Sequence, residues 1–106
     1  MANKQISSTQ NQLIKHIVLL KEKSRERKKT KTFVTEGERE IQLAINGQYT
    51  IETVLYFPEI YDTNKLSALP ENINCIEVTK EVYQKIAYRD TTEGIVAILN
   101  SRKDFS

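Results

Sequence analysis

One segment that is apolar on both faces constrains the fold of this chain more than any other feature. Residues 51–57 have the composition of a strand, residues 54–57 are all apolar or aromatic, and Pro58 ends the segment. Successive side chains of a strand point to opposite faces of the sheet, so this strand is expected to be buried on both sides. The pattern therefore predicts a central, mainly parallel sheet that is covered by helices.

Helix and strand patterns alternate along the rest of the sequence. A first helix is expected to begin near Ser7, where Ser7 and Gln10 have the spacing of a capping box, and its apolar residues continue to Leu20. A strand at 32–35, a helix at 36–46 that Gly47 closes, a weak helix at 61–69, a strand at 74–78, a helix from Thr79 to about Tyr88 and a strand at 95–99 complete the pattern. The alternation predicts a three-layer α/β/α sandwich with a mainly parallel four-stranded sheet.

Length and composition indicate one soluble domain. The chain has 106 residues, of which 39% are hydrophobic and 28% charged, and this composition argues against disorder. We expect a domain at 1–100 and the start of a linker at 101–106. No apolar run approaches the ~20 residues that span a bilayer, and no signal peptide is evident. The lone Cys75 fits a reducing cytoplasm, so we expect a cytoplasmic protein without membrane partners.

Charge is distributed unevenly along the chain. Residues 1–40 carry ten Lys/Arg and five Asp/Glu, a net charge of +5, whereas residues 41–106 carry six and nine, a net charge of −3. This asymmetry predicts that an anionic partner docks on the N-terminal part.

The positive charge is concentrated in residues 21–31, which contain seven bases, two acids and no apolar residue. The bases are Lys21, Lys23, Arg25, Arg27, Lys28, Lys29 and Lys31. Lys and Arg neutralise phosphates, and Arg also stacks on bases, so the segment is a candidate RNA-binding surface. A solvated helix end with local ion pairs to Glu22 and Glu26 has the same composition. Charge alone leaves both interpretations open.

Two further segments are expected to lie near each other in such a sandwich. One is the junction at 36–39, which contains Arg39, and the other is the polar loop at 89–93, which contains Arg89. Arg39 is predicted either to contact phosphate or to pair with Glu36 or a neighbouring carboxylate.

The sequence offers no complete catalytic or metal-binding apparatus. His16 is interpreted as a surface or boundary residue and Cys75 as a buried structural cysteine, because neither has a partner set with which to act. Three glycines exclude a glycine-rich phosphate loop. The tyrosines Tyr49, Tyr61, Tyr83 and Tyr88 fit core or boundary positions better than platforms for base stacking. We expect no catalytic, cofactor or metal site in this chain.

Two stretches of the sequence resemble a known family. The opening of SpoU-type (TrmH-type) RNA methyltransferases contains a Phe-Val-x-Glu-Gly-x-Arg signature, and residues 33–41 with Ala44 are similar to it. The preceding residues that share the resemblance are Ile6, Ser7, Ser8, Asn11, Ile14, Lys15, Leu20, Arg25 and Arg27. Residues 91–99 are similar to the strand that closes the same domain. That family commonly has Pro-Gln before the glycine of this strand, where this chain has Thr92 and Glu93.

The resemblance implies the N-terminal substrate-binding domain of an RNA 2′-O-ribose methyltransferase, with a ribosomal-protein-like fold and structured ribosomal RNA as partner. In that family a second, trefoil-knotted domain binds S-adenosylmethionine, dimerises and transfers the methyl group. Nothing after Leu99 resembles that domain, so we expect this chain alone to be a monomer without enzyme activity and the full-length parent to be a homodimeric enzyme. The predicted RNA contacts are the seven bases of residues 21–31 together with Arg39 and Arg89.

Two alternatives remain open at this stage. Ribosomal proteins of the same fold bind kinked RNA turns through a Gly-x-Asn-Glu stretch, but Arg39 stands where that stretch has its asparagine. The basic segment also suits a protein-interaction module with an acidic partner.

Overall fold

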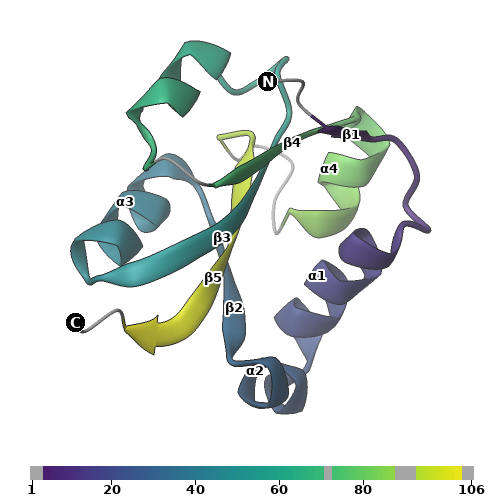
Figure 1. Cartoon of the computed structure of the whole chain (residues 1–106). Coiled ribbons are helices and arrows are strands. Elements are labelled where there is room, and N and C mark those ends of the chain that lie inside the picture. Colours follow the sequence, from purple (N-terminus) through teal and green to yellow (C-terminus); the bar gives the residue numbers. More distant parts are fainter. Residues whose placement is uncertain (1–3, 71–72, 88–92, 104–106) are drawn as a thin grey trace.

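The computed structural model describes residues 4–70, 73–87 and 93–103, which form a sheet and five helical segments (Figure 1). The strands are β1 (Lys4–Ile6), β2 (Thr32–Glu36), β3 (Tyr49–Tyr56), β4 (Asn74–Val78) and β5 (Ile95–Lys103). The helices are α1 (Gln12–Glu22), α2 (Ser24–Thr30), α3 (Glu38–Asn46), the 3₁₀ helix η1 (Thr63–Ala68) and α4 (Lys80–Ile86). Within the described ranges, no helix has the length and apolar character needed to cross a membrane.

The five strands form one sheet in the order β1-β4-β3-β5-β2. β4 pairs in parallel with β1 and β3, whereas β5 runs antiparallel to both of its neighbours, β3 and β2. Four described strands therefore run in one direction and β5 in the other, so the sheet is mostly parallel. The prediction of four strands was one too few, because β1 adds to the sheet through parallel pairing of Ile6 with Val78.

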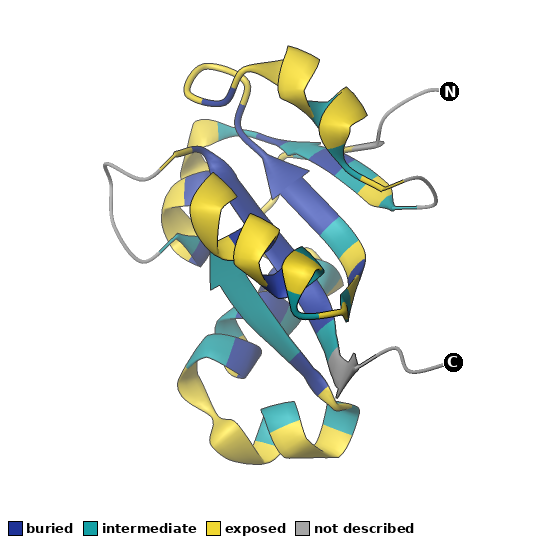
Figure 2. Cartoon of the chain, turned by 90° about the vertical axis from the view of Figure 1, so that its left-hand side faces the viewer, coloured by how far each residue is buried: buried dark blue, intermediate teal, exposed yellow. Residues whose placement is uncertain are grey.

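Helices cover both faces of the sheet, which confirms the three-layer α/β/α sandwich. α1 and α4 lie on one face, and α3 and η1 lie on the other (Figures 1 and 2). The α1/α4 side buries Ile14, Ile17 and Leu20 of α1 against Leu55 and Val96. The α3 side is a separate core, so each face of the central strands is covered, as residues 51–57 predicted.

A bulge in β3 changes the face of the sheet to which its side chains point. Ile51 pairs with Leu99 and Thr53 pairs with Ile98, so the register shifts at the exposed residue Glu52. One extra residue in a strand moves the following side chains to the opposite face. Ile51 and Val54 therefore pack in the same core although they are three residues apart.

Helix α1 begins later than the capping-box pattern predicted. Its cap is Asn11, whose side-chain oxygen accepts a hydrogen bond of 2.8 Å from the Leu13 amide. Ser8 is part of the preceding turn, where its hydroxyl accepts from the Gln10 amide. Several polar residues of this turn are of a type that caps helices, and Asn11 is the one whose side chain accepts a hydrogen bond from the first turn of α1.

Other boundaries also differ from the predictions. α3 starts at Glu38 because Gly37 adopts φ +93° and cannot be helical. Gly47 ends α3 with φ −82°, and the left-handed turn residue is Gln48. α4 ends at Ile86, η1 is a short 3₁₀ helix, and β5 continues to Lys103. Thr79 caps α4 by position only, because its buried hydroxyl has no hydrogen-bond partner within the described residues.

Candidate nucleic-acid interface

The basic segment forms its own short helix, α2, rather than a loop or an extension of α1. None of its residues is buried, and four of its seven residues are Lys or Arg, at the lower end of the molecule in Figures 1 and 2. The like-charged pair Arg25 and Lys29, four residues apart, costs about 0.2–0.5 kcal/mol. The bases at 27–29 in the last turn suit the negative end of the helix dipole. α2 is thus a small helix whose cations are exposed.

Arg27 fixes the angle between α1 and α2. Lys23 is extended, with φ −119°, and separates the two helices. The Arg27 guanidinium reaches back and donates hydrogen bonds to the carbonyls of Leu20 and Lys21 at the end of α1. The last carbonyls of an α-helix extend beyond its internal hydrogen bonding, so the hydrogen bonds from Arg27 stabilise the end of α1.

Lys21 also contacts the protein itself. Its ammonium group donates a 2.7 Å hydrogen bond to the Ile86 carbonyl at the end of α4. Burial lowers the pKa of Lys21, and the nearby carboxylates of Glu36 and Glu22 act in the opposite direction. Lys21 and Arg27 therefore connect helices, whereas the other predicted bases of this segment are exposed. These are Lys23, Arg25, Lys28, Lys29 and Lys31.

A polar hollow lies at the bend between α1 and α2. It is lined by Leu19, Glu22, Lys23, Ser24, Arg25 and Glu26. Two bases and two acids balance there, so the hollow itself has no net charge. The excess positive charge of this end comes from Lys28, Lys29 and Lys31, which lie outside its lining.

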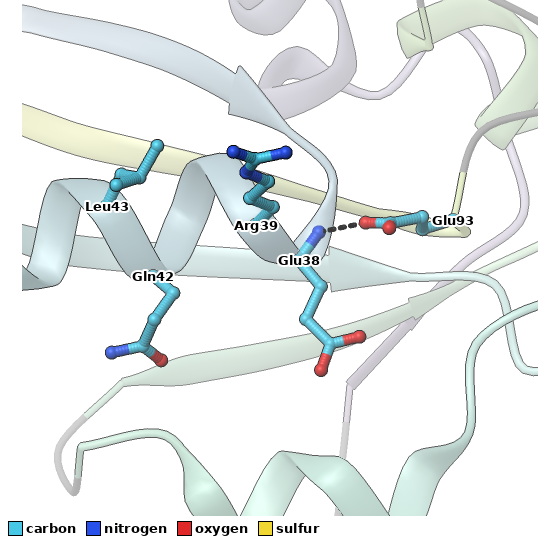
Figure 3. Close-up of a pocket in the computed structure, with 5 residues that line it drawn as sticks. All are labelled: Glu38, Arg39, Gln42, Leu43 and Glu93. Atoms are coloured by element: carbon cyan, nitrogen blue, oxygen red, sulfur yellow. Dashed lines mark hydrogen bonds between the residues drawn. The ribbon is translucent and has the colours of Figure 1, made fainter.

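Arg39 lies in a different setting, at the beginning of α3. The carboxylate of Glu93 accepts a hydrogen bond from the Glu38 amide and takes the place of a side-chain cap, which Gly37 cannot provide. Figure 3 shows Arg39 and Leu43 on one side of α3 and Glu38 and Gln42 on the other. These four residues and Glu93 line a hollow that contains one base and two acids, for a net charge of −1. Within the described ranges, Arg39 forms no ion pair.

The predicted RNA contacts do not form one compact site. β2 separates α2 from the start of α3, and five strand residues extend about 16 Å. The two segments that were predicted to lie near each other, residues 36–39 and 89–93, do meet, because Glu93 accepts a hydrogen bond from the Glu38 amide. Arg89 lies outside the described residues.

A hydrogen-bonded junction that the sequence did not reveal fixes the residues around Gly94. The Gly94 amide donates to the Tyr83 hydroxyl at 2.9 Å, and its carbonyl accepts from the Phe57 amide at 2.8 Å. Next to it, the Gly37 amide donates to the Ile95 carbonyl at 3.0 Å. The junction therefore connects the ends of β2 and β3 with the start of β5. The only sequence signal for it was a glycine directly before an apolar strand.

A crevice between α3 and η1 is closed by an ion pair. Lys65 donates to Glu38 at 3.0 Å, and the two side chains are 50% and 48% exposed. The hydrogen bond to Glu38 raises the pKa of Lys65. Tyr61 lies in the same crevice, and burial raises the pKa of its hydroxyl. At such exposure the pair contributes little stability.

The remaining candidates for chemistry occupy ordinary structural positions. His16 is half-buried on α1, and Cys75 is half-buried on β4 rather than fully buried, where burial raises the pKa of its thiol. The described tyrosines pack in aromatic pairs, Phe33 with Tyr49, Tyr56 with Tyr61 and Phe57 with Tyr83, as predicted for core or boundary residues. In residues 4–70, 73–87 and 93–103, no group of three His, Cys, Asp or Glu side chains is arranged to hold a metal ion.

A mostly parallel sheet between two helical layers, with a cationic helix at one end, defines a small α/β/α domain with a basic surface. Comparison with family models matches residues 11–97 to the MRM3-like substrate binding domain, and the chain belongs to this family. The resemblance to the substrate-binding domain of SpoU-type methyltransferases is thereby confirmed. A search of curated proteins gives no match.

Solved structures share the fold. An RNA 2′-O ribose methyltransferase is 26% identical, with a TM-score of 0.79 over 92% of this chain and 38% of that one. An rRNA methyltransferase from Sinorhizobium meliloti is 26% identical, with a TM-score of 0.74 over 93% and 37%. The SpoU methyltransferase AviRb from Streptomyces viridochromogenes, in complex with AdoMet, is 17% identical and has a TM-score of 0.75 over 91% and 37%, which shows the fold alone. This chain thus spans well under half the length of the structures it matches.

Proposed function

We propose that this chain binds RNA as the substrate-binding domain of an S-adenosylmethionine-dependent RNA 2′-O-ribose methyltransferase, with structured ribosomal RNA as the substrate. The observation that carries the proposal is the exposed basic helix α2 on a domain of the MRM3-like substrate binding family. Two structures with 26% identity are titled as an RNA 2′-O ribose methyltransferase and an rRNA methyltransferase, which supports the same substrate class.

RNA binding in this proposal is mainly electrostatic. The five exposed bases of residues 21–31 neutralise phosphates and release counterions, and Arg39 assists from the opposite end of β2. Arg89, which lies outside the described residues, is proposed as a further phosphate contact. Such contacts position an RNA and carry little sequence information, so shape rather than sequence sets specificity.

The residues of this chain do not fit S-adenosylmethionine. The hollows at α3 and at the α1–α2 bend are lined largely by charged or polar side chains, and the sequence has three glycines and no glycine-rich loop. We therefore assign the cofactor and methyl transfer to another part of a longer, dimeric parent protein in the cytoplasm, and we derive no step of the reaction from these residues.

The test is titration of a fluorescein-labelled ribosomal RNA stem-loop with the 106-residue chain over a salt series from about 50 to 200 mM. The variant Lys28→Ala/Lys29→Ala removes two exposed cations of α2. The control Lys65→Ala/Lys80→Ala removes the same charge elsewhere on the surface.

We expect the α2 variant to bind more weakly than the control, with the slope of log affinity against log salt smaller by about 1.4 for two lost single-strand phosphate contacts. Failure of the wild-type chain to bind RNA at low salt would refute the proposal. Equal competition by polyglutamate would instead favour an acidic protein partner.

A further inference from the structure

A basic hollow lies on the outer side of α1, beside the end of α4. It has a volume of about 240 Å³ between the turn that precedes α1, the exposed side of α1 and the end of α4. Its lining consists of Thr9, Gln10, Lys15, Val18, Leu19 and Lys85. Both lysines are exposed, and neither forms an ion pair within the described residues.

Its charge distinguishes this hollow from the others described above. The hollow at α3 has one base and two acids, the one at the α1–α2 bend has two of each, and the crevice beside η1 has one of each. The α1–α4 hollow has two lysines and no carboxylate. Glu81 lies one turn before Lys85 on α4 but does not line the hollow.

Two ammonium groups around one small hollow repel each other. An anion between the lysines replaces that repulsion with attraction. Thr9 and Gln10 add polar groups that are able to hydrogen-bond to a phosphate oxygen.

The hollow is continuous with the basic end of the molecule. Leu19 lines both this hollow and the one at the α1–α2 bend, which contains Lys23 and Arg25. Lys15 and Leu19 are four residues apart on one side of α1, about 6 Å along the helix, and Lys23 follows as the extended residue after the end of α1. Leu19 is 40% exposed, so its apolar side chain is accessible between the two hollows.

We propose that the RNA path extends from α2 along the outer side of α1 to a second phosphate-binding position between Lys15 and Lys85. Leu19 lies between the two positions and contacts the apolar face of a ribose or base. This inference rests on the proposed RNA-binding function and adds residues that the basic segment does not contain.

The test uses the same labelled RNA stem-loop and salt series with three variants. Lys15→Ala/Lys85→Ala removes the two cations of the hollow, Leu19→Ala removes the apolar contact, and Lys65→Ala/Lys80→Ala is the charge-matched control. Circular dichroism and thermal melting of each variant establish that it is folded.

We expect Lys15→Ala/Lys85→Ala to bind at least severalfold more weakly than the control, with the salt slope smaller by about 1.4. Leu19→Ala is expected to weaken binding without changing the slope, because it alters no charge. If the α2 variant binds weakly but Lys15→Ala/Lys85→Ala matches the control, the extended path is wrong while the proposed function stands. If the wild type binds no RNA, both fail.

Discussion

Gly94 is the residue at which the backbone tolerates no side chain. Its φ is +82°, and an added Cβ would lie 2.8 Å from the Ile60 Cβ and 2.9 Å from the Tyr61 backbone nitrogen. Left-handed strain and overpacking together predict that Gly94→Ala lowers the free energy of unfolding by about 2–4 kcal/mol. Urea denaturation monitored by circular dichroism measures this loss.

Gly47 provides the matched control for that prediction. Its φ is −82°, and an added Cβ would meet its nearest neighbour at 3.4 Å, so Gly47→Ala is expected to change stability by less than about 1 kcal/mol. If both substitutions have the same effect, the close contact at Gly94 is not what constrains it.

Tyr83 stabilises the same junction from α4. Tyr83→Phe leaves the buried Gly94 amide without its hydroxyl acceptor, and we expect a loss of about 1–2 kcal/mol at neutral pH. Measurement of the unfolding free energy by urea denaturation at pH 7 gives the size of this effect. An unchanged stability would mean that another acceptor replaces the hydroxyl.

The pH dependence of the same variant has a defined sign. Burial raises the pKa of Tyr83 from 10.0 to about 12; the carboxylates of Glu36 and Glu93 also raise it, and the Gly94 hydrogen bond opposes the shift. Below pH 10 both states keep the phenol protonated. Between pH 10 and about 12 the unfolded state loses its proton first, so wild-type stability falls with rising pH. The advantage of wild type over Tyr83→Phe should therefore shrink across this window, and a constant difference would contradict the assignment.

At the scale of elements, α2 combines two kinds of basic residue that have the same charge and different roles. Arg27→Ala removes the hydrogen bonds to the Leu20 and Lys21 carbonyls, and we expect it to lower stability by about 1 kcal/mol. Lys28→Ala is expected to leave stability within about 0.5 kcal/mol, because Lys28 is exposed, and to weaken RNA binding. Urea denaturation and RNA titration of both variants test this division. It fails if Lys28→Ala is the more destabilising of the two.

The sequence predicted the elements whose patterns are local. The strand β4 was predicted with its observed bounds, and the apolar residues of β3 correctly indicated a central strand with both faces covered. β1 was missed because its three residues have one apolar member and pair with β4, more than seventy positions away. The antiparallel direction of β5 was not predicted either, because a strand that is apolar on both faces has the same composition in either direction.

The candidate site was predictable in composition but not in geometry. The charge of residues 21–31 is plain in the sequence, whereas the break at Lys23 has no glycine or proline to mark it. The contacts of Lys21 and Arg27 with helix ends depend on tertiary packing. Likewise, the hollow that contains Lys15 and Lys85 exists only because α1 packs beside α4.

At the scale of the whole molecule, β2 separates the two ends of the domain that are proposed to contact RNA. α2 and the start of α3 lie at opposite ends of that strand, which is about 16 Å long, and the hollows beside them have no lining residue in common. Residues this far apart act independently unless the structure between them changes. A double-mutant cycle of Lys28→Ala/Lys29→Ala with Arg39→Ala, measured as RNA affinity at one fixed salt concentration, should be additive within about 0.5 kcal/mol.

The same cycle also ranks the two ends. Arg39 lies beside Glu38 and Glu93, so part of its attraction for phosphate is cancelled, and Arg39→Ala should weaken binding less than loss of the two lysines. A coupling energy well above 1 kcal/mol would mean that RNA binding moves α2 and α3 relative to each other. A larger loss from Arg39→Ala would mean that the main RNA contact lies at the α3 end. Local net charge would then not determine where the RNA binds.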